Sequence, residues 1–151
     1  MTDTADTFLE AQEKYGVPTS NIKREGPHLF KWVLLNLAVN SGVTVYSVPN
    51  SVSKIGENAF DGCSSLQSIE MTDSVTEIKD GAFRNCTSLL SIVIPDSVIN
   101  IGESAFMDCI SLTSIRLSSN LTAIEDGTFF RCSKLPLVKI PEKVTSIGHE
   151  A

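Results

Sequence analysis

Residues 48–70 read VPNSVSKIGENAFDGCSSLQSIE, and the chain repeats this unit of 23 residues without insertion or deletion. The following units are MTDSVTEIKDGAFRNCTSLLSIV at 71–93, IPDSVINIGESAFMDCISLTSIR at 94–116 and LSSNLTAIEDGTFFRCSKLPLVK at 117–139. A fifth unit, IPEKVTSIGHEA, begins at 140, and the sequence ends within it at 151. Self-similarity at a fixed period of about 20 to 50 residues is typical of solenoids and other repeat arrays. The period therefore predicts a solenoid.

Each unit has eight positions that are apolar or small in every copy, which indicates side chains that point into a shared core. The alternation over 112–117 predicts a short strand with Ile115 and Leu117 inside and Ser114, Arg116 and Ser118 outside. Residues 98–101 suggest a second, shorter strand, and 104–106 suggest one helical turn. The turn between these two segments contains one glycine in every unit, which indicates a backbone with positive φ. The glycine lies two residues later in even units than in odd ones, so the positive φ is expected to shift with it. The core positions in the third unit are Ile94, Val98, Ile101, Ala105, Phe106, Cys109, Leu112 and Ile115.

The four cysteines, Cys63, Cys86, Cys109 and Cys132, occupy the same position in successive units. Equivalent side chains of a solenoid stack roughly 4.8 Å apart and run parallel, a geometry that does not suit a disulfide. A linear row cannot converge on a metal ion as a tetrahedral zinc site requires. We therefore predict buried free thiols, with no metal and no cofactor.

The first 47 residues lack the repeat and are predicted to cap it. Residues 3–15 and 28–40 have helical patterns, and the apolar face of the second would cover the first coil. Shifting this region by one repeat length sets Leu29 against Val52 and Tyr46 against Ile69, so residues 25–47 are interpreted as a degenerate repeat. The predicted division is a helical N-terminal cap with a degenerate first repeat at 1–47 and leucine-rich repeats at 48–151.

Composition and charge argue against several classes of function. The net charge of −6 is spread over acids and bases in every unit, so no basic stripe is present for nucleic acid. The most apolar run, 29–39, is about half the length that a membrane-spanning helix needs. The start of the chain has no secretory signal pattern, which leads us to expect a cytoplasmic location. His28 and His149 lie at opposite ends of the array with no nucleophile assembled around them, so we expect no enzyme.

The unit L-x-x-I-x-[IL]-P-x-x-[VL]-x-x-I-G-x-x-A-F-x-x-C resembles the BspA-like leucine-rich repeat of the Treponema pallidum type. The resemblance covers 48–151, and the fourth unit departs from it at Ser118, Glu125 and Thr128. It implies a right-handed, curved α/β solenoid in which strands at 66–71, 89–94, 112–117 and 135–140 line the concave face. It also implies protein binding without catalysis. Members of this family are often found on cell surfaces, in adhesion and host interaction, which competes with the cytoplasmic expectation.

The candidate binding residues are those that point outward from these strands. They form three rows, which read Ser68, Ser91, Ser114, Leu137; Glu70, Val93, Arg116, Lys139; and Thr72, Pro95, Ser118, Pro141. We hypothesise that a protein or peptide docks on this face. The alternatives are an ordinary solvated face and a structural spacer within a longer array. The proposed contact residues are Ser68, Glu70, Thr72, Ser91, Val93, Ser114, Arg116, Leu137 and Lys139.

The last unit stops one residue before the phenylalanine that every earlier unit places next. We therefore expect the chain to be a fragment of a longer array. Ile140, Val144 and Ile147 are expected to be exposed at this end, and exposed apolar side chains there would favour self-association.

Overall fold

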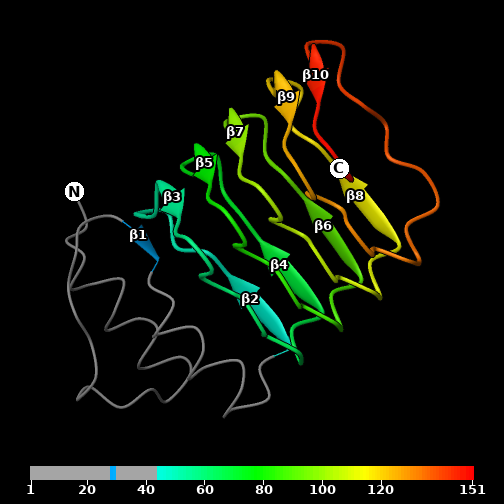
Figure 1. Ribbon diagram of the computed structural model, residues 1–151. Coiled ribbons are helices and arrows are strands. Elements are labelled where there is room, and N and C mark those ends of the chain that lie inside the picture. The colour runs from blue at the N-terminus through cyan, green and yellow to red at the C-terminus, as the bar shows by residue number, and fades with distance from the viewer. Residues whose placement is uncertain (1–27, 30–43) are drawn as a thin grey trace.

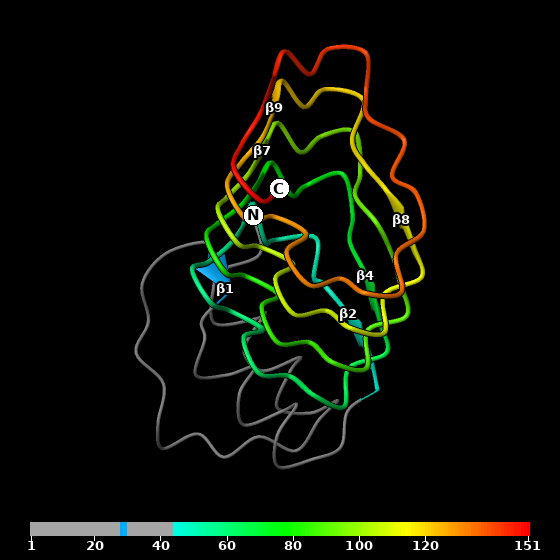
Figure 2. The ribbon, with the colours of Figure 1, turned by 45° about the vertical axis from the view of Figure 1, so that its right-hand side comes forward.

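The computed structural model describes residues 28–29 and 44–151, and these residues form a coil of short parallel strands without a helix. The strands stack in two ladders, which Figure 1 shows side by side and Figure 2 shows on opposite sides of the coil. The first ladder contains β1 (His28–Leu29), β3 (Lys54–Ile55), β5 (Glu77–Ile78) and β7 (Asn100–Ile101). Its course is continued by β9 (Ala123–Ile124), which pairs with β10 (Ser146–Ile147). The second ladder contains β2 (Val45–Ser47), β4 (Ser68–Glu70), β6 (Ser91–Val93) and β8 (Ser114–Arg116).

The register of the ladders follows the repeat length over most of the array. Tyr46 lies opposite Ile69, as the shift by one unit predicts. Leu29 instead pairs with Ile55, so the expected match of Leu29 with Val52 is wrong by three residues. His28 and Leu29 form a strand, so a helix does not begin at His28. The rest of that predicted helix lies outside the described residues, and so does the helix predicted at 3–15. The division of the chain at residue 47 stays a prediction.

The core is a set of side-chain columns, each contributed by one position of the repeat. Phe60 and Phe83 stack with their ring centres 5.0 Å apart, and Phe83 and Phe106 stack at 5.2 Å. The column continues to Phe129 at 5.8 Å, and Tyr46 packs edge-on against Phe60 at 5.5 Å. A single unit could not bury these rings alone, so each repeat depends on its neighbours for stability.

The expected helical turn before each cysteine is absent from the described repeats. Residues 104–108 form a series of turns in which N–H groups alternate between two kinds of partner. Met107 donates to the carbonyl of Ser104 at 3.1 Å within its own repeat, whereas Phe106 donates to Thr128 of the next repeat at 2.9 Å. A helix would keep all of these bonds inside one segment. The stacked turns instead use every second N–H to join neighbouring coils.

The positive φ angles do not shift between odd and even units, although the glycines do. They recur at two fixed positions of the repeat. The first position is occupied by residues 58, 81, 104, 127 and 150, and the second by residues 62, 85, 108 and 131. Gly81 has a φ of 61° and meets this requirement directly, whereas Ser104 has a φ of 53°. Gly102 serves another need, because a Cβ there would lie 2.5 Å from the backbone nitrogen of Asp80. The two glycine positions therefore meet different steric demands.

Candidate functional site

The strand face, defined as the outward-pointing residues of β2, β4, β6 and β8 together with Leu137 and Lys139, carries two of the three predicted rows. Its most exposed apolar side chains are Val93 at 56% and Leu137 at 88% of their full surface. The predicted residues Glu70, Ser91, Ser114, Arg116 and Lys139 are also exposed, and Ser68 is half-buried. A face with apolar side chains between charged ones offers both hydrophobic and polar contacts to a partner.

The third predicted row lies on this face only in part. Ser118 is fully buried, and its hydroxyl donates to the carbonyl of Val98 at 2.6 Å. Pro95 is buried as well, so the expectation that this row points outward is wrong at both positions. Thr72 is half-buried, with its hydroxyl 2.6 Å from that of Ser74. The chain therefore turns inward at Pro95 and Ser118, whereas Thr72 and Pro141 keep part of their surface exposed.

Charged side chains on the strand face are held by neighbouring groups. The Arg116 guanidinium lies 3.1 Å from the carboxylate of Asp96. The backbone N–H of Ser119 also donates to Asp96 at 2.8 Å. That N–H, followed by the Ser119 hydroxyl and Arg116, holds the pKa of the Asp96 carboxyl below its usual range. Glu70 accepts a hydrogen bond from the hydroxyl of Ser47 at 3.0 Å. Arg116 and Glu70 therefore occupy defined places on the strand face.

The second ladder ends at β8, because the predicted strand at 135–140 does not form. In the earlier units one N–H before each strand donates to the preceding repeat, as Leu90 does to Gln67 at 3.0 Å and Thr113 does to Leu90 at 2.9 Å. The next residue of this series is Pro136, which has no N–H. The carbonyl of Thr113 therefore accepts no backbone hydrogen bond within the described part of the chain. The ladder is broken by one missing donor.

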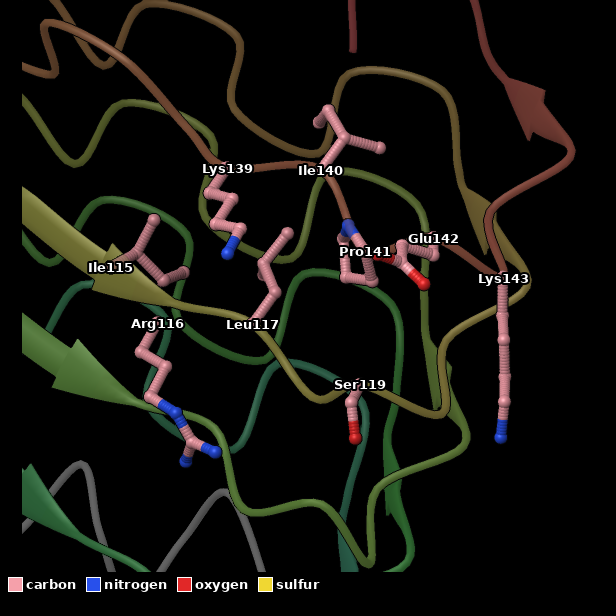
Figure 3. Close-up of a pocket in the computed structure, with 9 residues that line it drawn as sticks. All are labelled: Ile115, Arg116, Leu117, Ser119, Lys139, Ile140, Pro141, Glu142 and Lys143. Atoms are coloured by element: carbon pink, nitrogen blue, oxygen red, sulfur yellow. The ribbon is translucent and has the colours of Figure 1, made fainter.

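A cavity of about 620 Å³ opens where the fourth strand is missing. Residues 115–117 and Ser119 line one side, and residues 139–143 line the other (Figure 3). Figure 3 shows Ile115 and Leu117 pointing toward the opposite segment, and Lys139 reaching back across the gap toward β8. The Arg116 side chain points away from the gap. The volume falls within the range of about 300 to 1,000 Å³ that is usual for ligand sites.

A smaller cavity of about 240 Å³ lies between the ends of β4 and β6. The register of these strands covers Ser68 with Ser91 and Ile69 with Ile92, and stops before Glu70 reaches Val93. The two strands therefore part at their carboxyl ends. Glu70 and Val93, which belong to the same predicted row, line this opening.

The cysteine column is buried, as the repeat position predicts. The thiols of Cys86 and Cys109 donate to the carbonyls of Phe60 and Phe83 at 3.2 Å and 3.1 Å. Burial, with a smaller contribution from Asp61, raises the pKa of the Cys63 thiol to about 12. A thiol with such a pKa is a poor nucleophile near neutral pH. Within residues 28–29 and 44–151, no three His, Cys, Asp or Glu side chains gather to hold a metal ion.

The array of 23-residue coils with its phenylalanine and cysteine columns can now be compared with known families. A family model described as "BspA type Leucine rich repeat region" matches residues 39–151 with six copies. The chain belongs to the BspA-type leucine-rich repeat family. The match begins nine residues before Val48, so the family pattern extends into the region interpreted as a degenerate repeat. No curated protein sequence matches this BspA-type chain.

Solved structures agree with the family assignment. A leucine-rich repeat protein from T. pallidum is 32% identical, with a TM-score of 0.59, and the match covers 87% of this chain and 71% of that one. The pneumococcal vaccine antigen PcpA is 27% identical, with a TM-score of 0.59, over 70% of this chain and 26% of the antigen. A Bacteroides ovatus leucine-rich repeat protein is 28% identical, with a TM-score of 0.54, over 87% and 39% of the two chains. The BspA-type chain thus spans about a quarter of the length of PcpA.

Sequence reasoning missed the opening beside β8 and, apart from Arg116 and Lys139, the residues that line it. The available signal was Pro136, which occupies a position where Gln67, Leu90 and Thr113 each supply a donor. The role of Asp96 in holding Arg116 was also missed, because the two residues belong to different units and meet only when the coils stack. The part of the chain that the structure describes contains no helix long and apolar enough to cross a membrane.

Proposed function

We propose that this protein is a non-catalytic binding module that holds a protein or peptide on its strand face. The observation that carries the proposal is the row Glu70, Val93, Arg116 and Lys139, in which acidic, apolar and basic side chains follow one another at the repeat spacing. Leucine-rich repeats are generally protein-interaction modules, which supports this assignment. The exposed Val93 and Leu137 support it further, because a partner would remove both from water.

The similarity to PcpA, a pneumococcal vaccine antigen, supports a setting outside the cell. We propose adhesion or host interaction as the role of the chain in that setting. We infer that the partner is a protein with exposed acidic groups, since the basic end of the row is formed by Arg116 and Lys139. Self-association through the end of the array is a second expectation. It is supported by Ile140 and Ile147, which are exposed, whereas Val144 is half-buried.

Affinity capture with a matched control tests the proposal. The variant Arg116→Glu/Lys139→Glu reverses two charges on the strand face. The control Arg131→Glu/Lys134→Glu makes the same charge change away from it, and Arg131 resembles Arg116 in its exposed pairing with an aspartate. Proteins captured from host tissue lysate and bacterial culture medium are identified by mass spectrometry, and binding is then measured with the purified candidate.

The proposal expects a protein that is held by the wild type and by the control but lost by the face variant. Equal capture by all three chains would contradict binding through the strand face. That outcome would favour a structural spacer, in which the array sets a distance within a longer protein.

A further inference from the structure

We propose that the open edge of β8 binds an extended peptide with an acidic side chain, which joins the second ladder as a parallel strand. This inference rests on the proposed function and specifies the chemistry and the place of the partner. Sheet edges present unpaired backbone groups that can pair with another chain. Extended peptides commonly bind proteins by adding a strand to such an edge.

The backbone groups of β8 are arranged for this addition. The carbonyl of Arg116 faces β6, because it accepts a hydrogen bond from Ile94 at 2.8 Å. Successive residues of a strand direct their backbone groups to opposite sides, so the N–H and C=O of Ile115 face the cavity. The carbonyl of Thr113 and the N–H of Leu117 face the same way by the same alternation. In the part of the chain that the structure describes, none of these four groups has a backbone partner.

The cavity also offers suitable space and charge. Its apolar wall includes Ile115 and Leu117, which point toward the opposite segment (Figure 3). The ammonium group of Lys139 reaches across the gap and forms no ion pair with any residue in the described ranges. Lys143 lies at the end of the cavity and donates to the side chain of Asn120 at 2.6 Å. An incoming carboxylate would therefore meet an unpaired cation beside an apolar wall.

The array itself supplies a model of the peptide. Residues 65–72, SLQSIEMT, form the strand of the first unit and place Glu70 in the row that also contains Arg116 and Lys139. A peptide of this sequence on β8 would place its copy of Glu70 beside Lys139, the cation that faces the gap. Its copies of Ser68 and Glu70 would direct their N–H groups to β8, as the originals do to β2. Its copy of Ile69 would direct its N–H away from β8.

The test measures binding of the fluorescently labelled octapeptide SLQSIEMT to the whole chain by fluorescence anisotropy. A methyl group on the backbone nitrogen of the Ser68 copy or of the Glu70 copy should weaken binding by about tenfold or more, because it removes a donor and blocks close approach. The same methyl group on the Ile69 copy is the matched control and should leave the affinity within about threefold. Equal effects at all three positions, or no binding of the parent peptide, would overturn strand addition.

Charge reversal tests the acidic preference. Replacing the glutamate of the peptide by lysine should weaken binding to the wild type by about tenfold, and Lys139→Glu in the protein should do the same to the parent peptide. Combining the two changes should restore most of the affinity. A failure to restore it would contradict the pairing with Lys139.

The variant Pro136→Thr provides a test on the side of the protein. A threonine restores the N–H that Thr113 has at the preceding position, so residues 137–139 should close onto β8 and exclude the peptide. Unchanged peptide binding in a folded Pro136→Thr chain would overturn the edge site. The proposed function fails separately, because it depends on capture through Arg116 and Lys139 whether or not the short peptide binds.

Discussion

The phenylalanine column offers the sharpest test of how the repeats hold one another together. Phe83 is fully buried and stacks on Phe60 and Phe106 at 5.0 Å and 5.2 Å. Phe129 is half-buried and, among the described residues, stacks only on Phe106, at 5.8 Å. Phe83→Ala removes a whole buried ring and leaves a cavity between two others, which costs about 4 kcal/mol of unfolding free energy. Phe129→Ala loses roughly half the burial and one stacking contact, so it should cost about 2 kcal/mol.

Urea denaturation followed by circular dichroism measures both losses. Because the free energy of unfolding of a domain is about 5 to 15 kcal/mol, the Phe83→Ala midpoint should fall clearly below that of Phe129→Ala. Phe83 also lies in the middle of the array, so its loss should uncouple the repeats on either side and lower the denaturant slope. A Phe83→Ala variant no less stable than Phe129→Ala would refute the claim that stacking between repeats supplies the stability.

Three further predictions follow from single contacts. Pro136→Thr should raise the unfolding free energy by about 1 kcal/mol in urea denaturation, since it restores one backbone hydrogen bond, and a loss of stability would contradict the account of the broken ladder. Ser118→Ala should cost about 1 to 2 kcal/mol in the same assay, because it leaves the buried carbonyl of Val98 without its donor at 2.6 Å, and an unchanged midpoint would contradict that role. Burial raises the pKa of the Cys63 thiol from the ordinary value of 9.0 to about 12 in the folded chain. The neutral, buried thiol therefore contributes to stability fully below pH 9.0, and this contribution is lost as the pH rises toward 12. Alkaline titration by circular dichroism should therefore show unfolding in this window, with a weaker pH dependence in Cys63→Ala, and an equal dependence in the two chains would contradict it.

The sequence predicts the core well because every core position is repeated. Cys109 and Phe106 recur with their equivalents at a constant spacing, so their burial follows from the period alone. Ser118 could not be assigned in this way, because it replaces the proline of the preceding unit with serine, a residue that is usually exposed. Only the stacked backbone reveals the carbonyl of Val98 that its hydroxyl reaches.

The turn segments and the end of the second ladder also depend on contacts between repeats. A run such as Ser104 to Phe106 favours a helical turn locally, yet its alternate N–H groups are used by the next coil. The pairing of Leu29 with Ile55 differs from the repeat spacing, which no period could predict. The opening beside β8 was predictable in principle from Pro136, since a missing donor interrupts a ladder whatever the packing.

Methyl NMR with the captured partner tests most directly whether the strand face is the binding surface. Val93 and Leu137 are exposed on this face, at 56% and 88%, whereas Ile99 and Ile110 have comparable exposures of 51% and 44% away from it. The account predicts that the partner shifts or broadens the methyl signals of Val93 and Leu137 and leaves those of Ile99 and Ile110 unchanged. Changes at Ile99 and Ile110, with Val93 and Leu137 unaffected, would contradict binding through the strand face.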